Sequence, residues 1–187
     1  MEGRIIPNRG DNYEKLLTYR KATVLYDITY FFCSHFVDKR DRTYDQMVQS
    51  ARSGKQNIVE GCAASATSSE TEIKLINVAK ASFKELLEDY KDYLRRSGFR
   101  QWEDGSVEKE AMRKLGAKNS DTSFYRKLIA TRPAETIANM AIVLLYQEDY
   151  LLHRQLQSLE RAFKKNGGFR EKMARVRREE QGKQRRQ

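Results

Sequence analysis

The chain has 187 residues, a formal net charge of +10, 2 prolines, 10 glycines and 2 cysteines. This length allows one continuous apolar core, and the scarcity of proline favours long helices over a β architecture rich in turns. The longest apolar stretch, 137–146, is too short to cross a bilayer, and two cysteines are too few for a disulfide framework or a cysteine zinc site. We therefore expect a cytoplasmic, all-α protein with reduced cysteines and no membrane anchor.

Four segments of the chain have apolar residues that recur every three and four positions, which is the spacing of an amphipathic helix. The predicted helices cover residues 13–37, 44–62, 69–96 and 133–165. Capping boxes mark the starts of the first three helices, and their first members are Asp11, Thr43 and Ser69. Gly98 is expected to end the third helix, and the pair Gly167-Gly168 the fourth.

The connection between the third and fourth helices, 98–132, is longer than the roughly 2 to 8 residues that usually join helices in a bundle. Two of its stretches, 106–115 and 122–130, have the pattern of short helices. It also contains Trp102 and several other aromatic side chains, so we expect it to fold and dock on the long helices. The predicted fold of residues 1–166 is an up-down four-helix bundle with this helical insertion.

Most of the positive charge lies near the C-terminal end of the sequence. Residues 161–187 hold eleven basic and three acidic side chains, a balance of +8, which leaves +2 for the rest of the chain. A flexible basic tail over 167–187 would bind phosphate backbones, and the alternative is a solvated tail that only aids solubility. The candidate nucleic-acid-binding residues are Arg161, Lys164, Lys165, Arg170, Lys172, Arg175, Arg177, Arg178, Lys183, Arg185 and Arg186. The next candidates, on the predicted bundle itself, are Arg52, Lys55, Lys80 and Lys84.

The sequence contains no pattern that predicts catalysis. The two histidines, His35 and His153, lack the Glu-x-x-His spacing of a di-iron site and the preceding arginine of a HEPN-type ribonuclease. Nucleotide-binding loops, a nucleophile elbow and a Cys/His metal cluster are missing as well. The acidic pair Glu148-Asp149 is adjacent in sequence, so we expect it on a solvated helix surface. We therefore predict no catalytic residue, no metal site and no cofactor.

A polar cluster on the second and third predicted helices is unusual for solvated helix surfaces. Glycine and asparagine lower helix propensity, so their presence in mid-helix requires another reason, and Gly54 and Gly61 would let another helix approach closely. Asn57 and Glu60 share one helix face, which would meet polar residues of the third helix. We expect these contacts to be structural, within the chain or across a subunit boundary, with loss of a buried hydrogen bond to Glu60 costing about 1.5 to 3 kcal/mol. The members of the cluster are Asn57, Glu60, Gly61, Ser82 and Glu85.

Three motifs between residues 47 and 94 carry a resemblance to a known family. They are the run Asn-Ile-Val-Glu-Gly at 57–61, the Ser-x-x-Glu box at 69–72 and the series Ile-x-x-Ala-x-x-Ser-x-x-Glu-Leu at 76–86. This set resembles the signature of the bacterial four-helix-bundle proteins first noticed in intervening sequences of 23S ribosomal RNA. The same family includes the accessory variability determinant of diversity-generating retroelements. The insertion and the basic tail resemble its longer variant, the four-helix-bundle suffix domain.

The resemblance implies an up-down bundle that assembles into a ring-like homopentamer. For the retroelement members it also implies binding to a reverse transcriptase and its RNA. We therefore expect a non-enzymatic, oligomeric adaptor that binds nucleic acid, RNA above DNA, or a nucleic-acid enzyme such as a reverse transcriptase. The alternative is a purely structural assembly module without nucleic-acid binding, and an unrecognised nuclease is the third hypothesis.

Overall fold

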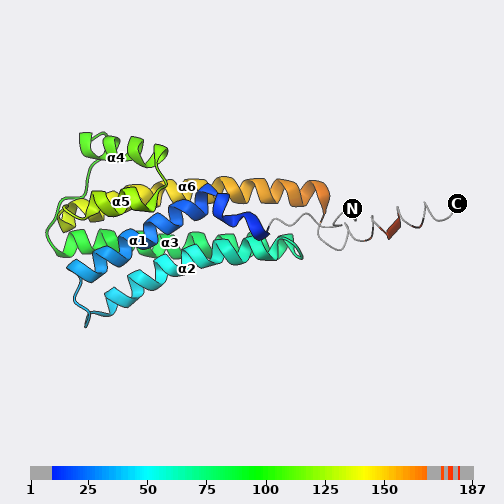
Figure 1. The fold of residues 1–187 in the computed structure, drawn as a ribbon, viewed down its shortest axis with the longest axis horizontal. Helices are drawn as coiled ribbons and strands as arrows, with labels where there is room; N and C mark the ends of the chain where they lie inside the picture. Colours follow the sequence, from blue (N-terminus) through cyan, green and yellow to red (C-terminus); the bar gives the residue numbers. More distant parts are fainter. Residues whose placement is uncertain (1–9, 168–173, 175–176, 179–180, 182–187) are drawn as a thin grey trace.

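A computed structural model describes residues 10–167 together with residues 174, 177, 178 and 181 (Figure 1). Within this part of the chain all regular structure is helical, with six α-helices, one short 3-10 helix and no strand. The prediction of an all-α fold is confirmed.

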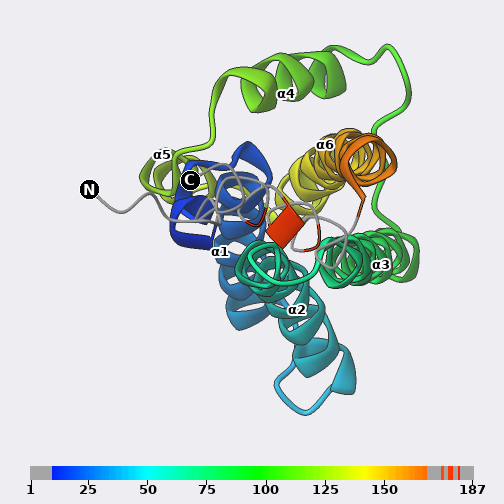
Figure 2. The ribbon, with the colours of Figure 1, turned by 90° about the vertical axis from the view of Figure 1, so that its right-hand side faces the viewer.

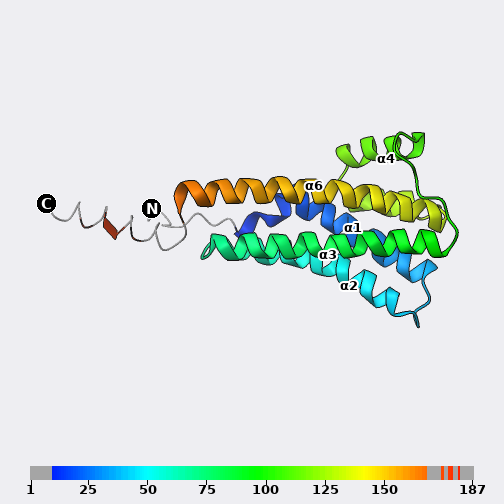
Figure 3. The same cartoon turned by 180° about the vertical axis from the view of Figure 1, so that it is seen from behind.

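Four long helices form the main body of the protein. They are α1 (Leu17–Phe36), α2 (Arg42–Ala64), α3 (Ser69–Arg96) and α6 (Ala134–Asn166). Helix α1 packs against α2 and α6, and α3 packs against the same two helices (Figure 2). The chain reverses direction from each long helix to the next (Figures 1 and 3). The four periodic segments of the sequence are therefore the four long helices of the structure.

The inward faces of these helices share one apolar core. Phe32, Phe83 and Tyr90 are among its largest buried side chains. The ring centroids of Phe32 and Tyr90 are 5.0 Å apart, and the Tyr90 hydroxyl donates a hydrogen bond of 3.0 Å to Thr29 Oγ1. Large aromatic side chains thus join α1 to α3 through the centre of the body, where their burial contributes strongly to stability.

The segment between α3 and α6 folds into two further helices, α4 (Val107–Lys118) and α5 (Thr122–Ile129). Helix α4 packs along the outside of α6, and α5 packs against α1 (Figure 2). Residues 137–145 of α6 are all buried, because α1 and α3 cover one side of this stretch and α4 covers another. The expectation of an ordered insertion that docks on the long helices is confirmed.

Two predicted helix ends are confirmed, and one predicted start is wrong. Gly98 and Gly167 follow α3 and α6 with φ values of 68° and 67°, a conformation that favours glycine. The first segment, however, begins as a separate 3-10 helix, η1 (Gly10–Lys15). Leu16 then adopts an extended conformation with ψ of 131°, so α1 starts only at Leu17.

The capping residues of α2 and α3 also differ from the prediction. The side chain of Asp41 accepts a hydrogen bond of 2.9 Å from the Thr43 N–H, which makes Asp41 the cap of α2. The Ser68 hydroxyl accepts the N–H of Thr71, which makes Ser68 the cap of α3. Thr43 and Ser69, which were predicted as caps, lie inside the helices. At the start of α2 and of α3, more than one neighbouring polar residue could serve as the cap. The path of the backbone that enters the helix determines which residue does so.

Gly54 allows the closest approach between α2 and α3. A Cβ atom at this position would lie 2.5 Å from Cζ of Phe83, a ring that is itself buried in the core. A Cβ at Gly61 would lie 3.3 Å from Cδ1 of Ile76, at the flexible end of that side chain. The mid-helix glycine at 54 is therefore required by packing, as the sequence suggested.

We predict that Gly54→Ala lowers the free energy of unfolding by about 1 to 3 kcal/mol, because the Phe83 ring has to move in a packed core. Gly61→Ala is the matched control and should change the free energy of unfolding little. Its gain in helix propensity, up to about 1 kcal/mol, offsets the milder contact of the new Cβ atom with Ile76. Urea unfolding of both variants measures the difference. Equal stability of Gly54→Ala and the wild type would contradict the close packing of α2 on α3.

Candidate nucleic-acid interface and other candidate sites

The first part of the predicted nucleic-acid-binding segment is the last turns of α6. Arg161, Lys164 and Lys165 are exposed there, at the end of the body opposite α4 (Figure 3). Arg177 and Arg178 are also exposed, and their backbone is helical. Within the described residues none of these five side chains forms an ion pair. These positive charges are therefore at the surface of the described part of the chain.

The rest of the predicted segment lies outside the described residues. This holds for Gly168, the second glycine of the predicted helix-ending pair, and for the flexibility expected of the tail. It also holds for the remaining basic candidates, Arg170, Lys172, Arg175, Lys183, Arg185 and Arg186.

The four basic residues that the sequence offered as second candidates have different surroundings. Lys80 Nζ pairs with Asp149 Oδ1 at 3.5 Å, and Lys55 Nζ lies 4.6 Å from the ring centroid of Tyr26. Arg52 and Lys84 are exposed and form no ion pair with any described residue. The charge of the body is therefore partly neutralised, in contrast to the end of α6.

The polar cluster joins α2 to α3 through one pair of hydroxyl groups. Ser53 Oγ and Ser82 Oγ are 3.0 Å apart. Asn57 Nδ2 donates to the Ser53 carbonyl over 2.8 Å and to Ser53 Oγ over 3.1 Å, so Asn57 supports this contact from its own helix. Gly61 is buried beside Ile76. Ser53 was missing from the predicted cluster, although its position four residues before Asn57 places both on one helix face.

The predicted contact of Glu60 with α3 is wrong within the chain. Glu60 and Glu85 are both exposed, and neither has a hydrogen-bond partner among the described residues. Glu60 follows the buried Ala51 by nine residues, and Glu85 follows the buried Ile76 by nine; this is about two and a half helical turns. Each carboxylate therefore faces away from the core. Only the alternative contact, across a subunit boundary, is left for Glu60.

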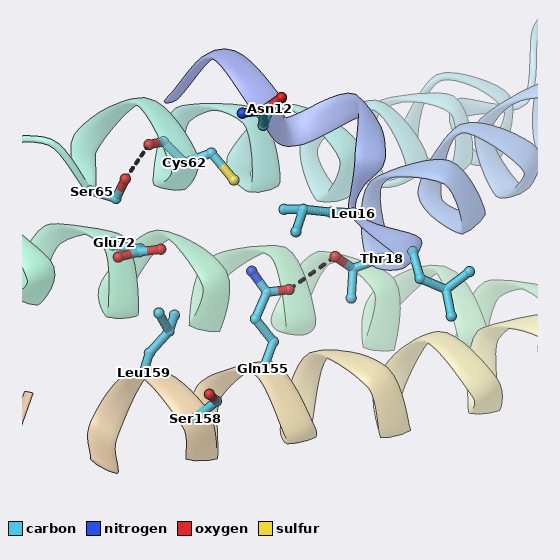
Figure 4. Close-up of a pocket in the computed structure, with 10 residues that line it drawn as sticks. Asn12, Leu16, Thr18, Cys62, Ser65, Glu72, Gln155, Ser158 and Leu159 are labelled. Atoms are coloured by element: carbon cyan, nitrogen blue, oxygen red, sulfur yellow. Dashed lines mark hydrogen bonds between the residues drawn. The ribbon is translucent and has the colours of Figure 1, made fainter. Parts of the chain in front are cut away.

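A pocket of 420 Å³ lies between η1, α1 and the ends of α2, α3 and α6 (Figure 4). The Thr18 hydroxyl donates a hydrogen bond of 2.9 Å to Gln155 Oε1 on its wall. The carboxylate of Glu72, which is buried, also lines it. Burial and the charge of Glu72 raise the pKa of the Cys62 thiol to about 11, so this thiol stays protonated and weakly nucleophilic at neutral pH.

The structure also gives the positions of the other cysteine and of the two histidines. Cys33 is buried against Met47, and burial, assisted by the charge of Asp89, raises the pKa of its thiol to about 12. His35 and His153 are exposed. Among the described residues, no three histidine, cysteine or acidic side chains are grouped so that they could hold a metal ion.

Glu148 and Lys21 form a buried pair of ionisable groups between α6 and α1, which corrects the solvated position expected for Glu148. Both carboxylate oxygens of Glu148 are buried, and neither has a hydrogen-bond partner among the described residues. Burial raises the pKa of Glu148 well above its ordinary value, an effect that the positive charge of Lys21 opposes. Burial likewise lowers the pKa of Lys21, and the charge of Glu148 opposes that shift. The sequence does contain a signal for this position. Glu148 lies four residues after Leu144 and four residues before Leu152, which places it on the apolar face of α6.

Comparisons of the chain with protein-family models, with curated proteins and with solved structures found no match. None of the helices in the described part of the chain is both long and apolar enough to cross a membrane. The functional interpretation therefore depends on the residues and their arrangement.

We predict that Glu148→Gln removes a pH-dependent loss of stability. The folded-state pKa of Glu148 is raised, so the unfolded chain releases this proton first as the pH rises. Between about pH 4.5 and the folded-state pKa of Glu148, the free energy of unfolding of the wild type should therefore fall relative to that of Glu148→Gln. The expected fall is about 1.4 kcal/mol for each pH unit. Unfolding in urea at pH 4, 5, 6 and 7 measures this difference.

The matched control for this experiment is Glu103→Gln, because Glu103 is exposed and its side chain makes no hydrogen bond or ion pair in the described part of the chain. Its stability should follow that of the wild type across the same pH range. A constant difference between the wild type and Glu148→Gln at all four pH values would contradict a neutral, buried Glu148.

Proposed function

We propose that this protein is a non-enzymatic, oligomeric adaptor that binds nucleic acid, RNA above DNA, through the basic segment 161–187. The observation that carries the proposal is the position of the described charges of this segment. Arg161, Lys164, Lys165, Arg177 and Arg178 are all exposed and form no ion pair with described residues.

The separation of charge along the chain supports the same proposal. Residues 161–187 have a balance of +8, whereas the rest of the chain has +2. Unpaired lysine and arginine side chains that contact phosphates release counterions, and this release gives affinity without base contacts. The segment would therefore bind tightly in low salt and discriminate little between sequences. Several copies of it in one oligomer would raise the avidity further.

We also propose that the fold is an up-down four-helix bundle of the family named from the sequence motifs. The alternating directions of α1, α2, α3 and α6 and their mutual packing support this assignment. So does the helical insertion, which is expected of the longer variant. Under this proposal the protein partner is a nucleic-acid enzyme such as a reverse transcriptase, and the assembly is a homopentamer.

The test of nucleic-acid binding is truncation after Asn166. The truncated chain should keep the helical body and lose at least about 100-fold in affinity for a single-stranded RNA, because most phosphate contacts are removed. For the intact protein, 6 to 10 phosphate contacts predict a loss of about 10³-fold or more between 50 and 200 mM salt. Fluorescence anisotropy with RNA and DNA oligonucleotides of one sequence measures both effects and the preference for RNA.

The matched control for the truncation is the full chain with Arg52→Gln and Lys84→Gln, which removes two exposed charges from the body. This control should bind almost as well as the wild type. Undiminished binding by the truncated chain would place the interface on the body. If neither the intact nor the truncated chain binds RNA or DNA, the proposal fails and a structural assembly module remains.

Self-assembly is tested by light scattering on the full chain, for which we predict a mass of about five times 21.9 kDa. Glu60 is exposed on α2, and if it lies at the subunit boundary, Glu60→Ala should reduce the assembled fraction. Gln49→Ala, another exposed position of α2, is the control and should assemble normally. A monomer whose mass does not change with concentration would contradict the assembly.

A further inference from the structure

Polar side chains of α6 and α1 bind backbone groups of α4 and of the loop before it. In the loop, the buried Asn139 of α6 accepts a hydrogen bond of 2.7 Å from the Trp102 backbone N–H and donates one of 2.9 Å to the Arg100 carbonyl. In the middle of α4, Gln147 Nε2 donates to the Arg113 carbonyl over 2.8 Å. Lys21 Nζ of α1 donates to the Gly116 carbonyl. Because these bonds are made to backbone groups, they set the position of α4 directly.

A groove lies between the first turns of α4, the end of α5 and the first turns of α6. Its volume is 620 Å³, which is within the range of roughly 300–1,000 Å³ typical of small-molecule sites. The apolar part of the lining comes from α4, α5, α6 and the loop before α4, and consists of Trp102, Met112, Leu115, Leu128 and Met140. Trp102, Leu115 and Leu128 are half-buried and provide the accessible apolar surface, whereas Met112 and Met140 are each only 4% exposed. The indole ring offers a flat contact surface.

The charges on the rim indicate the chemistry of the occupant. Arg100 Nη2 pairs with Glu108 Oε1 at 2.9 Å, and Glu135 Oε1 accepts the backbone N–H of Arg100 over 3.2 Å. Of the four charged side chains that line the groove, only Arg132 has no hydrogen bond or ion pair with a described residue. A guanidinium group binds a carboxylate through two parallel hydrogen bonds.

We propose that the groove between α4 and α6 is a binding site for a small monocarboxylic acid with an aliphatic chain. The chain lies on Trp102, Leu115 and Leu128, and the carboxylate pairs with Arg132. The site is on the half of α6 that is remote from the basic segment, so this inference is independent of nucleic-acid binding.

Decanoate is the probe, because it combines a chain of suitable length with one carboxylate. Trp102 is the single tryptophan of the protein, so its fluorescence reports on this groove alone. Titration of the full chain with decanoate should give a saturable change in emission. Decanol has the same chain without the charge, and it should bind at least about tenfold more weakly because one charge-assisted hydrogen bond is lost.

Three variants locate the site. Arg132→Gln should weaken decanoate binding at least about tenfold and leave decanol unchanged. Lys114→Gln is the matched control, because it removes one exposed positive charge of α4 outside the groove, and it should bind decanoate normally. Ala111→Phe places a ring at the groove and should weaken decanoate and decanol alike.

The proposal is overturned if decanoate gives no saturable change, or if decanol binds equally well. Equal loss of affinity in Arg132→Gln and Lys114→Gln would also overturn it, because the effect would then reflect only net charge. Normal decanoate binding by Ala111→Phe would place the ligand elsewhere.

Discussion

The burial of residues 137–145 on every side is the constraint on which the rest of this structure depends. A helix inside an ordinary bundle has one face in water, whereas this part of α6 is apolar all round and requires a further layer. Helix α4 supplies that layer. The insertion between α3 and α6 is therefore part of the core of the protein, and its removal would expose an apolar surface of α6.

The second layer is attached through polar groups, which makes its position specific. Asn139 of α6 binds backbone groups of the loop before α4, Gln147 of α6 binds the Arg113 carbonyl in the middle of α4, and Lys21 reaches the Gly116 carbonyl from α1. Asn139 and Lys21 are buried, and buried polar groups are costly unless they are paired, so their bonds disfavour other placements of α4. Glu148 is an exception, since both of its oxygens lack a partner among the described residues.

Charge and packing are separated along α6. Its first half is enclosed by α1, α3 and α4, and its last turns carry exposed Arg161, Lys164 and Lys165 without ion pairs to described residues. One helix thus joins the apolar centre of the protein to the segment that holds most of its net charge. Under the proposed function, the rigid first half positions the basic end relative to the other subunits, and the groove beside α4 remains free for a small ligand.

Sequence periodicity alone determined the number and order of the α-helices and, apart from the start of α1, their approximate extent, because apolar spacing is a local property of the chain. The same locality explains the confirmed helix ends at Gly98 and Gly167, whose positive φ values favour glycine. Spacing also placed Asn57 and Glu60 on a common stretch of helix, but it could not show which neighbour each would meet. Tertiary packing decided that Ser53 contacts Ser82 and Glu60 faces outward, and it buried Glu148. Which side of a helix is covered depends on contacts between segments far apart in the sequence.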